Sequence, residues 1–134
     1  MRDQQTLKKC HVYVIDDDSA VLDSMAFLLD AVGYPCATFP DGSEFLAKVD
    51  TLARGCVVTD FQMPGMNGYE LYAAIRARSI DWPICLMSST RKGLAPRAKA
   101  LGFIDFLPKP IAAETLVRVL DRAEQLLSPG PGTT

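Results

Sequence analysis

Four short apolar runs in this chain each lead into a polar side chain that can take part in chemistry. HVYVI is followed by Asp16–Asp18, CVVT by Asp60, ICLM by Ser88 and FIDFL, through Pro108, by Lys109. In an open parallel sheet, ligands bind beyond the carboxyl ends of the strands, where residues distant in sequence meet. The pattern therefore predicts one composite acidic site. A fifth run, PCATFP, ends without such a side chain, which favours a strand at the sheet edge.

Segments with helical spacing separate these runs. Apolar residues recur at helical intervals within 21–32, 45–49, 71–75, 94–101 and 116–127. Gly33 stands where a helix C-cap belongs, and Asp41 opens the second helix. The segment FQMPGMNG contains Pro64 and several residues that favour tight turns, so it is expected to be a shaped loop.

The alternation of strands and helices predicts an α/β fold with a parallel sheet. Each crossover between parallel strands is right-handed and places its helix on one face of the sheet. We therefore expect a three-layer (βα)5 sandwich with a five-stranded sheet of order 2-1-3-4-5. The fourth and fifth strands are expected over Ile84–Met87 and Phe103–Leu107.

Length and composition suit one globular domain. With 134 residues, 49% hydrophobic content and a net charge of −2, the chain can form one core and has no broad basic surface for nucleic acid. The start of the chain lacks an apolar signal region, and no run is long enough to span a membrane. We expect a cytoplasmic protein with an N-terminal extension at 1–9, a folded domain at 10–127 and a linker stub or disordered tail at 128–134.

The four cysteines are expected to be reduced. Cys10, Cys36, Cys56 and Cys85 are far apart in the sequence and form neither a CxxC pair nor a zinc-type spacing. Most lie in or beside apolar runs, where a thiol behaves as a small hydrophobic side chain.

The predicted site combines carboxylates with one lysine and one hydroxyl. Asp16, Asp17 and Asp60 would repel one another at short range, and a divalent cation such as Mg²⁺ relieves this repulsion. Lys109 supplies a compact positive charge for a phosphoryl oxygen, and Ser88 can donate a hydrogen bond to another. A carboxylate in such surroundings can act as a nucleophile toward phosphorus. Asp60, alone at a central strand end, is the best candidate.

The motifs IDDD, VVTDFQMPGMNGYEL, LMSS and FIDFLPKP resemble the receiver domain of two-component response regulators, over roughly Val12 to Leu127. The resemblance implies a flavodoxin-like fold and phosphorylation of Asp60 by a histidine kinase. It also implies that Asp16 and Asp17 form an acidic pocket. Mg²⁺ would then contact Asp17, Asp60 and the backbone carbonyl of Gln62.

The resemblance extends to the residues that transmit the signal. It implies that Ser88 is the switch hydroxyl, Phe106 the switch aromatic and Lys109 the phosphate-contacting lysine, with a cis Lys109–Pro110 bond. The fourth helix, fifth strand and fifth helix would form the responsive surface for dimerisation or output. The sequence motifs of this chain are most like those of receivers attached to LuxR-type DNA-binding domains. Ser89 departs from the glycine or alanine common there, and the stretch from Ser88 to Gly102 is one residue shorter.

Two other functions are compatible with parts of the pattern. A stand-alone receiver would act through protein contacts alone. A phosphatase of the haloacid dehalogenase type would use Asp16 as its nucleophile, because Asp16-x-Asp18 resembles its DxD start. Such enzymes usually carry a cap insertion, for which this chain has no room. We expect a phosphorylated switch rather than a turnover enzyme.

Overall fold

The computed structural model describes residues 9–89 and 94–128, which form a five-stranded parallel sheet. Its strands are β1 (His11–Ile15), β2 (Cys36–Phe39), β3 (Gly55–Asp60), β4 (Ile84–Ser88) and β5 (Asp105–Pro108). Their order is β2-β1-β3-β4-β5, as predicted. The strand of PCATFP lies at the edge, and this confirms the inference from its lack of a reactive end.

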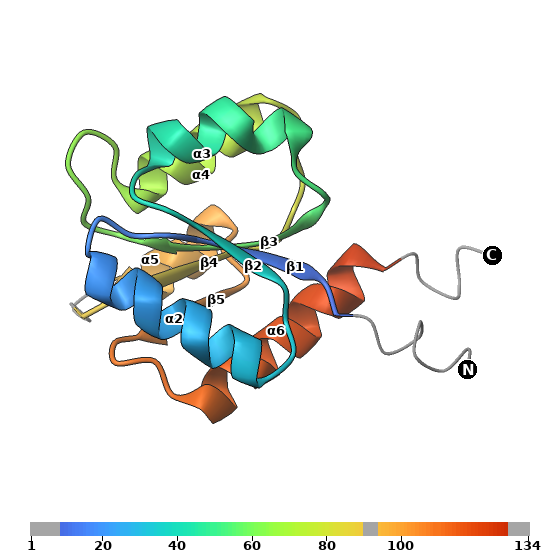
Figure 1. Ribbon diagram of the computed structural model, residues 1–134. Coiled ribbons are helices and arrows are strands. Elements are labelled where there is room, and N and C mark those ends of the chain that lie inside the picture. The colour runs from blue at the N-terminus through green and yellow to red at the C-terminus, as the bar shows by residue number, and fades with distance from the viewer. Residues whose placement is uncertain (1–8, 90–93, 129–134) are drawn as a thin grey trace.

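Helices cover both faces of the sheet, so the predicted three-layer sandwich is confirmed (Figure 1). They are α2 (Ser19–Ala31), α3 (Gly42–Lys48), α4 (Gly68–Ala77), α5 (Leu94–Leu101) and α6 (Ala113–Leu127), with a short 3-10 turn η1 (Val49–Thr51) after α3. Helices α2 and α6 pack on one face, and α3, α4 and α5 pack on the other.

Side-chain caps set the starts of three helices. The carboxylates of Asp18 and Asp41 accept backbone N–H groups of Ala20 and Glu44 at the starts of α2 and α3. Asn67 and Glu70 form a reciprocal capping box at the start of α4. These caps satisfy N–H groups that have no partner within the helix. They also fix where each helix leaves the strand end before it.

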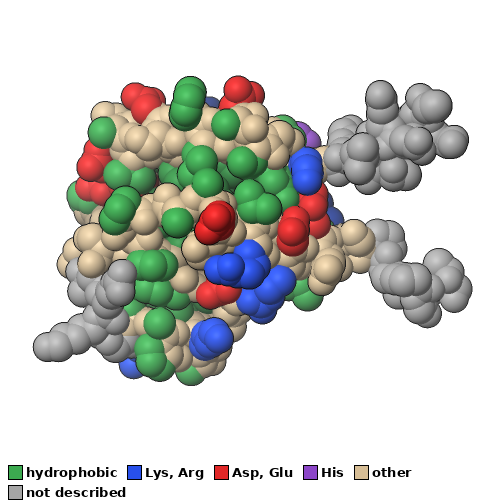
Figure 2. All heavy atoms as spheres, turned by 90° about the horizontal axis from the view of Figure 1, so that it is seen from below, with side chains coloured by type: hydrophobic (Ala, Val, Ile, Leu, Met, Phe, Trp, Pro, Cys, Tyr) green, Lys and Arg blue, Asp and Glu red, His purple; other side chains and the backbone are tan. Residues whose placement is uncertain are grey.

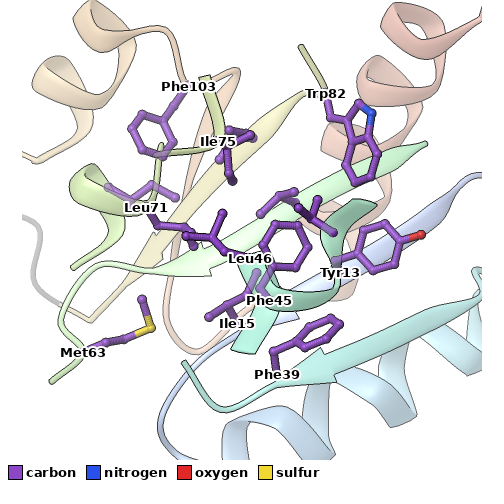
Figure 3. Packing of buried hydrophobic residues seen from close by; sticks show 14 of the residues in the cluster. Tyr13, Ile15, Phe39, Phe45, Leu46, Met63, Leu71, Ile75, Trp82 and Phe103 are labelled. Carbon is purple, nitrogen blue, oxygen red and sulfur yellow. The ribbon is translucent and has the colours of Figure 1, made fainter. Parts of the chain in front are cut away.

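The central strands are buried on both faces and divide the core into two clusters. Figure 3 shows part of the cluster under α3 and α4, where Tyr13, Phe39, Phe45 and Trp82 pack with aliphatic side chains. The second cluster lies under α2 and α6 and contains the buried thiols of Cys56 and Cys85. All four cysteines are free, as predicted.

The fifth strand begins later than the sequence pattern indicated. Phe103 was expected to start it, but its N–H donates to the carbonyl of Ala98 and closes the end of α5. Gly102 makes this closure possible because its φ is +117°, a conformation that favours glycine. Phe103 therefore belongs to the helix end, and β5 starts at Asp105.

Some expectations concern residues outside the described part of the chain. Residues 1–8 and 129–134 make up most of the predicted extension and tail, and residues 90–93 belong to the segment expected to be shortened. Among the described helices, none has the length and apolar character needed to cross a membrane.

Candidate functional site

The carboxyl ends of β1, β3, β4 and β5 converge, and backbone hydrogen bonds hold them in register. Asp60 pairs with Met87, and Ser88 pairs with Pro108. The N–H of Lys109 donates to the carbonyl of Ser88 at 3.0 Å, which ties the end of β5 to the end of β4. The polar strand ends singled out in the sequence therefore meet at one edge of the sheet.

Three carboxylates form the centre of this edge. Asp16, Asp17 and Asp60 each offer an oxygen atom, and these oxygens lie within 4.8 Å of one another. Asp16 is fully buried, Asp60 is 6% exposed and Asp17 faces solvent. The N–H of Asp18 donates to Asp16 at 2.9 Å and helps to fix that carboxylate. The cluster thus has a buried floor and one open side.

Lys109 is the cation that faces this cluster. Its Nζ lies 2.8 Å from Asp16 Oδ2 and 3.2 Å from Asp60 Oδ1. Burial acts to lower the pKa of Lys109, but the hydrogen bond to Asp16 and the charges of Asp16 and Asp60 outweigh it and raise the pKa above its ordinary value. The lysine is therefore held in its charged form between two carboxylates.

The carboxyl group of Asp60 is harder to ionise than an ordinary aspartate. Burial raises its pKa, and the nearby charge of Asp16 raises it further. Lys109 and the N–H of Phe61 act in the opposite direction but do not cancel the rise. Burial and the charge of Asp16 together thus oppose ionisation of Asp60.

The donor set fits a hard divalent cation. The cluster of Asp16, Asp17 and Asp60 has the carboxylate oxygen donors that Mg²⁺ prefers. A cation on the exposed side, next to Asp17, would offset part of the negative charge of this cluster. Gln62 lies two residues beyond Asp60 in an exposed loop on the same side of the sheet.

Ser88 and Phe106 lie on the two strands beyond β3. Ser88 ends β4 and is 2% exposed. Phe106 is half-buried, pairs in register with Leu86 and packs against the core cluster under α3 and α4. The Lys109–Pro110 bond is cis, which confirms the expectation from the family resemblance.

An apolar groove of about 430 Å³ borders the site. Its walls come from α2, from Ser89 after β4 and from the segment after β5, and include Val21, Met25, Lys109 and Ile111. Figure 2 looks onto the face that carries α2 and α6, where apolar side chains gather among charged ones. The groove reaches the site because Lys109 belongs to both.

Sequence reasoning missed one buried polar group beside Asp60. Thr59 is fully buried, and its hydroxyl donates to the backbone carbonyl of Asp60 at 3.0 Å. The signal in the sequence was a single hydroxyl in the otherwise apolar run CVVT. Because threonine is also a common strand residue, that signal is weak by itself.

The arrangement defines a phosphoacceptor module, and comparison with known proteins agrees. Residues 12–121 match the family model of the response regulator receiver domain. The chain belongs to the response regulator receiver family, whose members are the phosphoacceptors of two-component signalling. The haloacid dehalogenase alternative is thereby set aside. The side chain of Asp18, which that alternative requires in the site, caps α2.

Individual relatives share most of this chain. It is 40% identical over 122 residues to the transcriptional regulatory protein FixJ of Bradyrhizobium diazoefficiens, covering 90% of this chain and 60% of FixJ. The structure of full-length FixJ from B. japonicum matches with a TM-score of 0.82 at 41% identity, over 91% of this chain and 61% of that one. Chemotaxis protein CheY4 of Vibrio cholerae matches with a TM-score of 0.78 at 30% identity, over 86% and 98%. The chain thus spans about 60% of the length of FixJ.

Proposed function

We propose that Asp60 accepts a phosphoryl group from a histidine kinase and that the domain then acts as a switch. The observation that carries this proposal is the position of Asp60. Its carboxylate ends the central strand β3, lies 3.2 Å from Lys109 and belongs to a cluster with Asp16 and Asp17. Asp16 is fully buried and also accepts the N–H of Asp18, whereas Asp60 is 6% exposed, which favours Asp60 as the nucleophile.

We assign the metal-binding roles to the open side of the cluster. Asp17, Asp60 and the backbone carbonyl of Gln62 would hold Mg²⁺ directly, and Asp16 would complete the acidic pocket. When bound, Mg²⁺ supplies positive charge that offsets the charge on the phosphoryl oxygens. The exposure of Asp17 and of the loop at Gln62 supports this assignment, because Mg²⁺ usually keeps several waters.

The transfer step requires little covalent chemistry from the protein. A carboxylate oxygen of Asp60 forms a bond to phosphorus as the bond between phosphorus and the donor's imidazole nitrogen breaks, and the electron pair returns to that nitrogen. Lys109 stabilises the phosphoryl oxygens by charge, and Ser88 donates its hydroxyl to one of them. Water can later hydrolyse the acyl phosphate, so the domain cycles between two states without being a turnover enzyme.

Phosphorylation is proposed to change the surface formed by α5, β5 and α6. Ser88 would move toward the phosphoryl group, and Phe106 would follow into the space that it leaves. The burial of Ser88 beside β3 and the partial burial of Phe106 support this, since a two-state switch requires side chains that would exchange one packed position for another. The altered surface would control dimerisation or a DNA-binding output domain. A stand-alone receiver that acts by protein contact is the alternative.

The kinase is proposed to contact the apolar groove beside Lys109. A phosphohistidine must approach Asp60 from the open edge of the sheet, and the groove between α2 and the segment after β5 offers apolar surface there. Histidine kinases take their phosphoryl group from ATP, so we also propose that this domain acts in the cytoplasm, where ATP is available. We keep residues 10–127 as the extent of the receiver domain.

Phosphorylation mapping tests the assignment. Incubation with acetyl phosphate and Mg²⁺ should add one phosphoryl group, which peptide mapping by mass spectrometry should place on Asp60. Asp60→Asn should abolish the modification, whereas Asp18→Asn should retain it because asparagine also caps helices and Asp18 lies outside the cluster. Modification at Asp16, or equal labelling of Asp60→Asn, would overturn the proposal.

A further inference from the structure

We infer that Thr59 is a positioning residue for phosphoryl transfer, because its hydroxyl fixes the backbone that carries Asp60. This inference rests on the proposed function of Asp60. It assigns a role to a residue outside the acidic cluster and outside the pair Ser88 and Phe106. The hydroxyl of Thr59 bonds to the backbone carbonyl of Asp60, so the role we assign to it acts through the main chain.

The peptide group between Asp60 and Phe61 is held at both ends. At one end, the carbonyl of Asp60 accepts the hydroxyl of Thr59 at 3.0 Å. At the other end, the N–H of Phe61 donates to the carbonyl of Met87 at 3.1 Å. Because a peptide group is planar, fixing both ends fixes its rotation about the chain. That rotation sets the backbone angles on which the side-chain direction of Asp60 and the course of the following loop depend.

The start of helix α4 lies against this peptide group. The N–H of Gly68 donates to the carbonyl of Phe61, in the next peptide group, at 2.9 Å. A Cβ on Gly68 would lie 2.7 Å from the carbonyl oxygen of Asp60, so the helix start lies closer to that carbonyl than a residue with a side chain allows. The hydroxyl of Thr59, the strand β4 and the start of α4 thus surround one peptide group.

Burial of the Thr59 hydroxyl removes it from water, and its hydrogen bond to the Asp60 carbonyl offsets that loss of hydration. Thr59 is fully buried and its neighbours in register are Ile15 and Leu86, two apolar side chains. Burial of an unpaired hydroxyl is unfavourable, and valine has nearly the same shape without that cost. The bond to Asp60 therefore gives a physical reason for threonine rather than valine immediately before the phosphoacceptor.

The loss of this bond should slow phosphorylation without unfolding the domain. In Thr59→Val, the Asp60 carbonyl loses a donor and the peptide group gains freedom. We expect the first-order rate constant for acetyl phosphate labelling at saturating Mg²⁺ to fall about five-fold, the factor that one net hydrogen bond represents. Thr59→Ser keeps the hydroxyl and should stay within about two-fold of wild type.

Thr51 offers a matched control. Its hydroxyl also donates to a backbone carbonyl, that of Lys48 at 2.8 Å, but on η1, away from the carboxyl ends of the strands. Thr51→Val should leave the labelling rate unchanged. Chemical unfolding of each variant gives its stability, so a slow rate in a stably folded Thr59→Val cannot come from loss of structure. If Thr59→Val does not fold, Thr59→Ala and Thr59→Ser provide the same comparison.

Three outcomes would overturn the inference. Thr59→Val could label at the wild-type rate, Thr51→Val could slow labelling as much, or Thr59→Ser could be as slow as Thr59→Val, which would point to side-chain packing rather than to the hydroxyl. In all three cases the wild type is still labelled at Asp60. Failure of the wild type to label would instead contradict the proposed function itself.

Discussion

At the scale of single residues, the site has more negative charge than its partners neutralise. Lys109 contacts Asp16 and Asp60, while Asp17 is exposed and completes the cluster. Burial is the main cause of the raised pKa of Asp60, and the charge of Asp16 adds to it, so that the opposing effects of Lys109 and Phe61 are outweighed. The folded protein therefore keeps a carboxylate where ionisation is unfavourable, and this weakens the fold at neutral pH.

Replacing Asp60 by asparagine should stabilise the domain in a pH-dependent way. Because the pKa of Asp60 is raised on folding, the contribution of Asp60 to wild-type stability falls as pH rises from the ordinary aspartate value of 3.8 through the raised pKa. Asp60→Asn removes that loss, so its free energy of unfolding should exceed that of wild type at about pH 7, and the difference should shrink toward about pH 4. Urea unfolding across this range measures it.

The asparagine variant also removes the contact of Asp60 with Lys109. A lower stability of Asp60→Asn than of wild type at neutral pH would mean that this ion pair contributes more than burial and the repulsion from Asp16 cost. Asp18→Asn removes one charge outside the cluster and serves as the control, with little expected change in stability.

At the scale of the elements, the start of α4 is pressed against the end of β3. Gly68 allows this, since a Cβ there would lie 2.7 Å from the Asp60 carbonyl and 2.8 Å from Leu86. The capping box of Asn67 and Glu70 holds the same turn from the solvent side. The loop between Asp60 and α4 therefore has little room to move at its helical end.

Gly68→Ala should damage both stability and cation binding. The methyl group must displace backbone, so we expect a loss of about 1–3 kcal/mol in the free energy of unfolding. We also expect weaker Mg²⁺ binding by titration calorimetry. Gly33→Ala is the matched control, because its φ of +90° makes alanine strained while nothing lies within 4 Å of the new Cβ. It should lose stability but keep its Mg²⁺ affinity; equal affinity in Gly68→Ala would refute the link to the site.

Local patterns predicted most elements, and tertiary contacts account for what they missed. The strand ends and helix starts could be located because apolar spacing, Asp18 and Asp41 are local signals. Phe103 was assigned to a strand because its backbone bond to Ala98 leaves no trace in hydrophobicity. The contact of Lys109 with Asp16, residues 93 apart in sequence, and the hydroxyl bond of Thr59 depend on how strands and helix ends pack. No periodicity encodes them.

At the scale of the whole molecule, the two ends of the strands have different roles: one end carries the site, and the other carries structural contacts. The carboxyl ends of the strands carry the aspartates, Lys109 and the apolar groove. The amino ends are occupied by packing and capping contacts, such as those of Arg76 with the carbonyls of Ile80 and Trp82. We therefore expect ligands to bind, and so to stabilise the folded state, at the carboxyl ends of the strands.

Mg²⁺ should stabilise the folded domain through Asp17. At a concentration ten times its dissociation constant, a ligand that binds only the folded state adds about 1.4 kcal/mol to the free energy of unfolding. The thermal midpoint of wild type should rise with Mg²⁺, and Asp17→Asn should lose most of that rise. Asp18→Asn, one residue further on and outside the cluster, should keep it. A full response in Asp17→Asn would exclude Asp17 as a metal ligand.

The position of Trp82 has a practical consequence for optical work. The single tryptophan of the chain precedes β4 and stacks on Tyr13 with ring centroids 5.7 Å apart, within the aromatic cluster seen in Figure 3. Tyr13 itself is three residues before Asp16, about 10 Å along an extended strand. Intrinsic emission should thus follow unfolding cleanly and stay nearly constant during cation binding. For each substitution, a changed tryptophan emission would therefore indicate damage to the fold, whereas an unchanged emission with altered Mg²⁺ binding would indicate damage to the site.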